Sequence, residues 1–352
     1  MEHKKQVRVL IIDDSAFIRQ VFGNILRAQP GIEVAGYARD GGEGLTQLAL
    51  HCPDVVTLDL EMPNKDGFFF LQEMMEKQPT PAIVVSAWAK EGAEQTLKAL
   101  QMGAVDFVTK PGSRPSVDIY SIQDELVQKV QLCSRIRLAI KLQNMAALSK
   151  RAPSPLDSNK FPPPELTVIG CSTGGPKALD TIIADLGPNY PTPIVVAQHM
   201  PVGFTEAFAR RLNSSAKIPV KEAQQGEELA PGRIYIGPAG LQTIFERKRN
   251  RIYIKLAEMP GRVFRPSVDV MFHSAAEVCG KKVLALLMTG MGSDGAKGLK
   301  TLHDLGAWTI AESEETCIIY GMPRVAIEMG GAREVLPLTQ IADALRQRVK
   351  GI

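Results

Sequence analysis

Cysteine is scarce in this chain, and the few copies are not spaced for crosslinking or metal binding. The 352 residues include five cysteines, and no two of them form a Cys-x-x-Cys pair. An odd number at wide spacings excludes a disulfide framework and argues against a cysteine-ligated zinc site. We therefore expect free thiols in a reducing compartment. The five are Cys52, Cys133, Cys171, Cys279 and Cys317.

Long apolar runs and a strong excess of one charge are also absent. No stretch approaches the ~18 apolar residues that a membrane-spanning helix needs, and the charged first residues do not resemble a signal peptide. The net charge of +3 is small for this length and gives no electrostatic reason to expect nucleic-acid binding. We predict a cytoplasmic protein, monomeric, with no membrane insertion and no nucleic-acid partner.

The length and composition indicate two globular domains. Apolar residues make up 45% and charged residues 22%, as in ordinary soluble proteins, and the chain is too long for one core. Helical spacing runs over 121–150, and five prolines in 151–164 then prevent regular structure. We predict one domain at 1–122, a helix and proline-rich linker at 123–164, and a second domain at 165–352. The apolar stripe of the helix consists of Ile122, Leu126, Val130 and Cys133.

Both domains alternate short apolar runs with helical patterns, which is typical of α/β folds with parallel sheets. We predict a five-stranded, flavodoxin-like first domain and a doubly wound α/β second domain with an inserted β-hairpin within 233–256. The predicted strands are 7–12, 33–38, 54–60, 82–87 and 105–109, then 166–170, 194–198, 233–236 and 282–289. The predicted helices include 15–28 and 91–102, then 175–186, 204–213, 268–279 and 296–305.

Polar side chains follow the strands of the first domain, at the edge where open α/β sheets bind ligands. Asp13 and Asp14 follow the first strand, and Asp59 ends the third. Three converging carboxylates need a cation, and oxygen ligands suit Mg²⁺. Ser86 and Lys110 end the next two strands and suit the oxygens of a phosphoryl group. Asp59 can then take that group as an acyl phosphate.

Four segments of this domain together resemble a response-regulator receiver domain. They are LIIDDS at 10–15, VVTLDLEMPNKDG at 55–67, VVSA at 84–87 and AVDFVTKPG at 104–112. The resemblance covers about 1–120. It implies that Asp59 is the phosphoacceptor and that the Glu61 carbonyl joins Asp13, Asp14 and Asp59 as Mg²⁺ ligands.

The same resemblance assigns the residues that sense the phosphoryl group. It implies that Ser86 and Lys110 contact that group and that Phe107 is the aromatic switch residue. It also implies a cis peptide between Lys110 and Pro111.

A glycine-flanked serine follows the first strand of the second domain. GCSTG, at 170–174, fits the G-x-S-x-G pattern that places a nucleophilic serine on a strand-to-helix turn. The pattern alone is weak, because glycine-flanked serines also occur in phosphate-binding loops. Rossmann-type nucleotide binding is disfavoured, since no G-x-G-x-x-G is present. A nucleophilic Ser172 requires a base and an orienting acid.

Histidine is rare enough to narrow the choice of base. Of five histidines, only His199, in AQHMP, ends a strand of the second domain. A histidine at one strand end can reach a serine at another end of the same sheet, so His199 is the candidate general base. The others are in the N-terminal tail, in the first domain or in helical patterns: His3, His51, His273 and His303.

The orienting acid is expected in the loop LLMTGMGSDGAKG, at 286–298. Asp294 is its one carboxylate and is predicted to accept the Nδ1 proton of His199. The glycines let the backbone approach a ligand, so the Met291 amide is a candidate oxyanion donor. Thr173 flanks Ser172 and is a second candidate for contact with the substrate or its oxyanion.

The motifs GCSTGGP, AQHMP, LLMTGMGSDGAKG and YGMPR (320–324) resemble the chemotaxis-specific protein-glutamate methylesterases over essentially the whole chain. The resemblance implies a serine hydrolase that acts on glutamate methyl esters of methyl-accepting chemoreceptors and also deamidates receptor glutamines. The ester hydrolysis itself needs no cofactor. It implies phosphorylation by the chemotaxis histidine kinase, which relieves a block of the cleft by the unphosphorylated receiver.

Three alternatives stay open at this point. Cys171 is a rival nucleophile beside Ser172. The protein could be a phosphorylation-gated binding module that docks a receptor or kinase without turnover, although all three triad members are present. A DNA-binding regulator would need a basic recognition helix, and the most basic stretch of the second domain, ERKRNRIYIKL, is instead interpreted as a hairpin.

Overall fold

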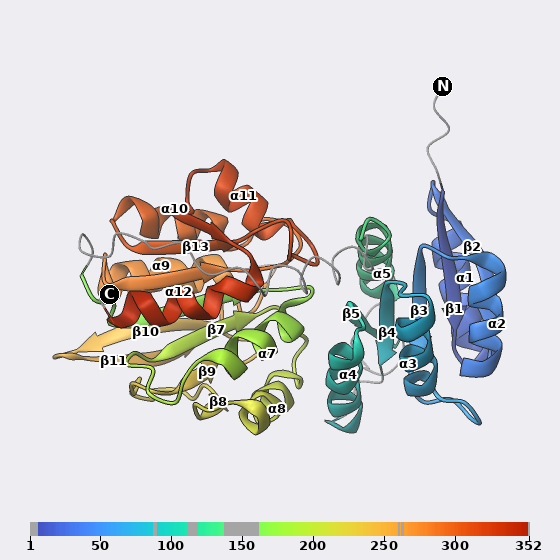
Figure 1. Ribbon diagram of the computed structural model, residues 1–352, viewed down its shortest axis with the longest axis horizontal. Coiled ribbons are helices and arrows are strands. Elements are labelled where there is room, and N and C mark those ends of the chain that lie inside the picture. Colours follow the sequence, from blue (N-terminus) through green and yellow to red (C-terminus); the bar gives the residue numbers. More distant parts are fainter. Residues whose placement is uncertain are drawn as a thin grey trace. The chain divides into compact units, whose positions relative to one another are not determined.

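The computed structural model describes residues 6–86, 90–110, 119–136, 162–259, 261 and 264–350. The chain divides into two compact units, Met1–Ile140 and Lys141–Ile352, and each is described by itself (Figure 1). Within the described residues, no helix combines the length and apolar character needed to cross a membrane. The 110–111 peptide bond and most of the predicted linker lie outside the described residues.

The first unit is a parallel five-stranded sheet with strand order β2-β1-β3-β4-β5, flanked by five helices. The central strands are continuous apolar runs because both of their faces are covered. Helices α1, α2 and α3 are capped at their N-termini by Ser15, Asp40 and Asp66, whose side chains accept hydrogen bonds from first-turn amides. The elements are β1 (Val7–Ile12), α1 (Ala16–Arg27), β2 (Ile32–Ala38), α2 (Gly41–His51), β3 (Val55–Asp59), α3 (Gly67–Lys77), β4 (Ala82–Ser86), α4 (Lys90–Met102), β5 (Asp106–Thr109) and α5 (Ile119–Cys133).

The second unit is a seven-stranded parallel sheet with the order β14-β13-β12-β6-β7-β9-β8, and a separate antiparallel hairpin of β10 and β11. Helices α7, α8 and α12 form one packed group, and α9, α10 and α11 form another. The elements are β6 (Leu166–Cys171), α7 (Gly175–Asp185), β7 (Ile194–Gln198), α8 (Thr205–Ser215), β8 (Val220–Glu222), β9 (Ile234–Ile236), β10 (Gln242–Lys248), β11 (Arg251–Ala257), α9 (Val268–Cys279), β12 (Val283–Leu287), α10 (Ala296–Asp304), β13 (Trp308–Glu312), α11 (Met322–Glu328), β14 (Glu334–Leu336) and α12 (Leu338–Lys350).

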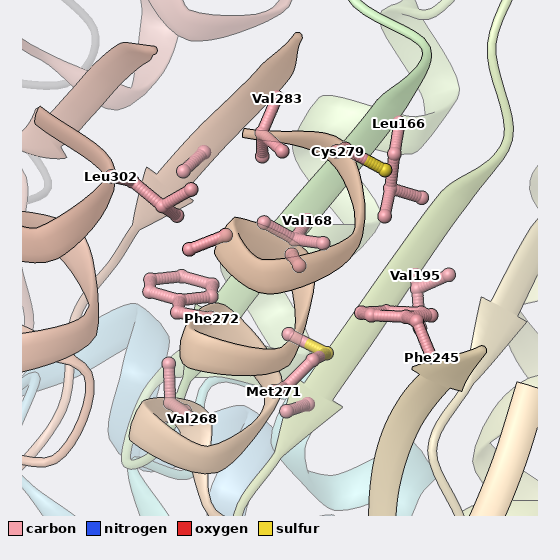
Figure 2. Packing of buried hydrophobic residues seen from close by; sticks show 14 of the residues in the cluster. Leu166, Val168, Val195, Phe245, Val268, Met271, Phe272, Cys279, Val283 and Leu302 are labelled. Carbon is pink, nitrogen blue, oxygen red and sulfur yellow. The ribbon is translucent and has the colours of Figure 1, made fainter. Parts of the chain in front are cut away.

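The core of the second unit is built around α9, which contacts β6, β10, β12 and α10. Met271 and Phe272 on this helix are fully buried, and so is Val168 on β6. Figure 2 shows these side chains together with Phe245 of the hairpin and Leu302 of α10. Each such side chain stabilises the fold by about 1.5–3 kcal/mol through burial. This packing fixes the position of α9 in the domain. The N-terminal end of α9 then contributes hydrogen-bond donors to the candidate functional site.

The fold class is the predicted one, with two differences in the elements. A helix was predicted over 121–150, whereas α5 ends at Cys133, where the amides of Arg135 and Ile136 bond carbonyls three residues back and tighten the last turn. Residues 137–150 of that prediction lie outside the described residues. The apolar stripe of α5 is buried as expected. The short strands β8, β13 and β14 and the helices α11 and α12 were not predicted from the sequence.

Candidate active site and phosphoacceptor site

The carboxyl ends of three neighbouring strands carry the predicted catalytic residues, and the side chains of His199 and Asp294 are in contact there. Ser172 follows β6, His199 follows β7, and Asp294 lies in the loop between β12 and α10. In the sheet, β6 lies between β7 and β12. The strands that follow β6 in the sequence are added on one side of it (β7) and later on the other side (β12). Open α/β sheets bind ligands at such a switch point.

Backbone contacts and glycines fix the turn that carries Ser172. Its amide donates to the Thr289 carbonyl at 3.0 Å, and the Gly175 amide donates to the Ser172 carbonyl at 2.8 Å. Gly174 has a φ of +79°, a conformation in which a side chain would be strained. A Cβ on Gly290 would lie 2.8 Å from Ser172 Cβ, so only glycine allows the β12 loop to come this close to the serine.

His199 and Asp294 form a buried hydrogen-bonded pair. Nε2 lies 2.7 Å from Oδ2, and the side chains are 10% and 7% exposed. Asp294 also accepts hydrogen bonds from the Ser267 hydroxyl at 2.8 Å and from the amides of Val268 at 2.7 Å and Asp269 at 3.0 Å. These donors lie at the N-terminal end of α9, where the helix dipole favours a negative charge.

The environment of Asp294 favours its ionised form. Burial acts to raise its pKa, but the hydrogen bonds from His199, Asp269 and Val268 outweigh burial and hold the pKa below its ordinary value. An ionised carboxylate can only accept hydrogen bonds, so Nε2 of a neutral His199 carries the proton and Nδ1 has the free lone pair. The expectation that Nδ1 faces Asp294 is wrong. The histidine ring has roughly two preferred orientations about the Cβ–Cγ bond. The sequence does not determine which of the two is adopted.

Thr173 lies on the turn that carries Ser172, and Met291 lies on the loop that follows β12. The Thr289 hydroxyl donates to the Thr173 carbonyl at 2.9 Å and so joins this loop to the turn. The Thr289 amide donates at 2.9 Å to the carboxylate of Glu312, which is fully buried at the end of β13. In the part of the chain that the structure describes, the Met291 amide has no hydrogen-bond partner, which leaves it available to a substrate oxygen.

Cys171 does not offer an alternative nucleophile. Its side chain is fully buried, and its thiol donates to Gln198 Oε1 at 3.0 Å. Burial raises the pKa of this thiol, and a cysteine nucleophile acts as the thiolate. The structure therefore leaves Ser172 as the candidate at this turn.

Two residues near the pair were missed by sequence reasoning. Gln198 is buried, and its side-chain amide donates to the carbonyls of Ser172 at 3.0 Å and His199 at 2.9 Å. Its position as a polar residue at the end of an apolar strand was an available signal. Phe264 stacks on the His199 ring with centroids 4.2 Å apart and an interplanar angle of 5°. Nothing in the sequence near Phe264 points to this contact.

The carboxylates predicted at the strand ends of the first unit converge. Asp13, Asp14 and Asp59 each offer an oxygen, and these oxygens lie within 4.8 Å of one another. Lys110 Nζ lies 2.7 Å from Asp59 Oδ2 and 3.5 Å from Asp13 Oδ2. The cluster lies where β1 and β3 end, at the switch point of this strand order.

This cluster is suited to a divalent cation. Burial raises the pKa of Asp13 and raises that of Asp59 to about 6, while Lys110 opposes both shifts. Asp13 Oδ2 is buried and, among the described residues, has no hydrogen-bond partner, its nearest cation being Lys110. An all-oxygen set with an orphaned buried oxygen fits Mg²⁺, which receiver domains typically use for phosphorylation.

Ser86 and Glu61 are connected to the residues of this cluster through the backbone: the Lys110 amide donates to the Ser86 carbonyl at 2.8 Å, and Glu61 follows β3. Ser86, at the end of β4, donates to the Gly92 carbonyl at 3.2 Å and accepts from the Thr96 hydroxyl at 2.6 Å. Phe107, on β5, is buried. The Glu61 amide donates to Asp59 Oδ1 at 3.3 Å. The backbone at Glu61 therefore lies beside the predicted phosphoacceptor.

The raised pKa of Asp59 predicts a stability difference that depends on pH. The folded-state pKa of about 6 exceeds the ordinary value, so the carboxyl contributes stability below about pH 4, and this contribution is lost as the pH rises through 6. In metal-free buffer at pH 7.5 we expect Asp59→Asn to be more stable than the wild type by up to about 3 kcal/mol, for a shift of about two pKa units. The difference should shrink toward pH 4.

Urea unfolding in EDTA at several pH values measures this difference. Asp14→Asn is the matched control, because Asp14 is exposed and its replacement should not reproduce the pH-dependent gain. An Asp59→Asn difference that stays constant from pH 4.5 to 7.5 would contradict the prediction.

Both units match families of known proteins. Residues 167–345 match the family described as CheB methylesterase, and residues 9–118 match the response regulator receiver domain. A protein-glutamate methylesterase/protein-glutamine glutaminase of Symbiobacterium thermophilum is 42% identical over 98% of each chain. A protein of the same name from Halalkalibacterium halodurans is 43% identical over 99% of each chain.

A solved structure supports the fold of the second unit. The crystal structure of the Thermotoga maritima CheB methylesterase catalytic domain is 43% identical, has a TM-score of 0.51, and covers 52% of this chain and 98% of that domain. The chain is thus a response regulator whose output domain is an enzyme. It belongs to the family of the protein-glutamate methylesterases/protein-glutamine glutaminases.

Proposed function

We propose that this protein removes methyl groups from glutamate methyl esters of chemoreceptors and releases methanol, with Ser172, His199 and Asp294 as the catalytic triad. The observation that carries the proposal is the buried 2.7 Å pair of His199 and Asp294 beside a serine at the switch point of the sheet. In this proposal the hydrolase domain spans residues 165–352, the receiver domain spans residues 1–122, and the helix and linker at 123–164 connect them. Free cysteines in both units agree with a reducing cytoplasm.

The reaction proceeds in two halves. Ser172 Oγ attacks the γ-carbonyl of the methylated glutamate, and His199 Nδ1 takes the hydroxyl proton. His199 then returns the proton to the departing methoxide, which leaves as methanol. Water attacks the acyl-enzyme with His199 again as base. The bond between the acyl carbon and Ser172 Oγ breaks, His199 returns the proton to that oxygen, and the product carboxylate leaves. Asp294 stabilises the imidazolium that forms in each half.

The negative charge that develops on the carbonyl oxygen needs donors. The Met291 amide supplies one such donor because it has no partner within the described residues and lies on the loop that approaches Ser172. Thr173 flanks the other side. The same residues would hydrolyse a glutamine side chain, with ammonia as the leaving group in place of methanol.

The receiver controls this activity through Asp59. Asp13, Asp14 and Asp59, with the Glu61 carbonyl, would hold Mg²⁺, which neutralises charge on the transferred phosphoryl group. Asp59 accepts the group from the chemotaxis histidine kinase. Lys110 donates to a phosphoryl oxygen, and Ser86 and Phe107 change their contacts in response.

Methanol release from methylated receptor membranes tests the function and its control together. The samples are the wild type and Asp59→Asn, each with and without acetyl phosphate and Mg²⁺. We expect the phosphodonor to raise the wild-type rate several-fold, and Asp59→Asn to keep the basal rate without stimulation.

Two results would contradict the proposal. No release by a wild type that is phosphorylated on Asp59 would favour a binding module without turnover. Stimulation of Asp59→Asn would show that another group accepts the phosphoryl.

A further inference from the structure

One short segment, residues 264–269, holds both members of the His199–Asp294 pair. At its start, the Phe264 ring stacks on the His199 ring at 4.2 Å and 5°. At its end, the Ser267 hydroxyl and the amide of Asp269 donate to Asp294 Oδ1. The segment therefore touches the histidine through a ring face and the carboxylate through hydrogen bonds.

The position of this segment is itself fixed. The side chain of Gln242, at the start of β10, is fully buried. It donates to the Phe264 carbonyl at 2.8 Å and accepts from the Ser267 amide at 2.8 Å. The Gly240 amide donates to the Arg265 carbonyl at 3.0 Å. These bonds hold the backbone on both sides of Phe264, so the ring has a defined place against His199.

A single hydrogen bond to Asp294 leaves one motion of His199 unrestrained. The Nε2–Oδ2 contact fixes one atom of the imidazole, but the ring can still tilt about the direction of that bond. A tilt moves Nδ1, the nitrogen with the free lone pair, away from the Ser172 hydroxyl. A parallel ring at stacking distance opposes such a tilt. Tilting moves one edge of the imidazole away from the aromatic ring, which loses stacking, and pushes the other edge into steric overlap with it.

We propose that Phe264 is a positioning residue: its ring holds the plane of His199 in which Nδ1 takes the proton of Ser172. This inference rests on the proposed function and adds to it a residue that acts through His199 rather than on the substrate. Phe264 is 36% exposed and is not one of the fully buried core residues, and Phe264→Leu keeps an apolar side chain in its place. A loss of activity then reflects the histidine more than the fold.

Kinetics of three variants test the role. Phe264→Leu keeps an apolar side chain but removes the flat ring, and Phe264→Tyr keeps the ring. Tyr253→Leu, at a half-buried aromatic residue of the hairpin, is the matched control. We expect Phe264→Leu to lower kcat for methanol release by about 10- to 100-fold, as for a small misplacement of a catalytic group, with KM within about twofold. Phe264→Tyr and Tyr253→Leu should stay close to the wild type.

Two further measurements separate positioning from general damage. The rate at which a fluorophosphonate labels Ser172 needs no receptor, and Phe264→Leu should lower it by a factor similar to the loss in kcat. The chain has only five histidines, so ¹⁵N-histidine NMR can follow the Nε2–H proton of His199. That signal should shift or broaden in Phe264→Leu and persist in Phe264→Tyr.

The outcomes distinguish this inference from the proposed function. If the wild type is active and Phe264→Leu keeps kcat, or loses activity through KM alone, the positioning role is overturned and the esterase stands. The role is also overturned if Phe264→Tyr loses as much activity as Phe264→Leu. If the wild type releases no methanol and Ser172 is not labelled, the proposed function fails, and the positioning role fails with it.

Discussion

Replacement of Ser172 with alanine is expected to lower methanol release from methylated receptors by about 10⁴-fold or more. The physical reason is that an alanine has no hydroxyl to attack the carbonyl and the neighbouring Cys171 thiol is buried, so the carbonyl would have to react with water directly. The residual rate would come from the remaining oxyanion donors and substrate binding. The measurement is methanol release with acetyl phosphate and Mg²⁺ present, so that the wild type works at its full rate.

The neighbouring thiol gives the matched control for this experiment. Cys171→Ala removes a side chain that is fully buried and bonded to Gln198, and we expect it to keep activity within several-fold of the wild type. Substantial turnover by Ser172→Ala, together with loss in Cys171→Ala, would reverse the assignment of the nucleophile. Turnover by both variants would place the reaction elsewhere in the chain.

Asp294→Asn is expected to lower kcat by about 10³- to 10⁴-fold, the size of loss known when a triad aspartate becomes an amide. An asparagine has only one acceptor oxygen, whereas Asp294 accepts from His199, Ser267 and two amides of α9. If the amide nitrogen faces His199, it donates to Nε2 and moves the imidazole proton to Nδ1. The base then presents a proton to Ser172 instead of a lone pair.

Asp269→Asn is the matched control for Asp294. Asp269 is a second carboxylate at the same end of α9, and its Oδ1 accepts from the Gly298 amide at 2.7 Å. It has no contact with His199 among the residues that the structure describes. Burial raises the pKa of Asp269, and an asparagine keeps an oxygen for the Gly298 amide, so we expect Asp269→Asn to keep both the fold and kcat close to the wild type. Equal losses of kcat in the two variants, with both folded by circular dichroism, would mean that the end of α9 matters only as a structural support.

The sequence was sufficient for much of this site because strand ends are easy to locate. Apolar runs of five or six residues, such as Leu166–Cys171 and Ile194–Gln198, mark buried parallel strands, and the next polar residue is then at the ligand-binding edge. This reasoning identified Ser172 and His199 independently of the family resemblance. The receiver carboxylates were predicted in the same way.

Other features depend on distances that no local pattern encodes. The orientation of the His199 ring follows from packing against Phe264, which is 65 residues away in sequence. The end of α5 at Cys133 reflects a tightened last turn, although helical spacing continues in the sequence beyond it. The strand β13 was missed, yet its last residue, Glu312, anchors the loop that carries Met291 through Thr289.

The order of strands in the second unit makes catalysis a property of nearly the whole domain. Its seven-stranded sheet is parallel throughout, so no two of its strands can pair as a local hairpin, and each pairing must wait for a crossover to close. The turn that carries Ser172 and the loop that carries Asp294 come together only when β12 pairs with β6, across more than 100 residues of chain. A fragment or a nascent chain that stops before β12 therefore lacks the acid entirely. In the proposed mechanism, hydrolysis of a methyl ester therefore begins only after synthesis has passed that strand and the long-range closure is complete.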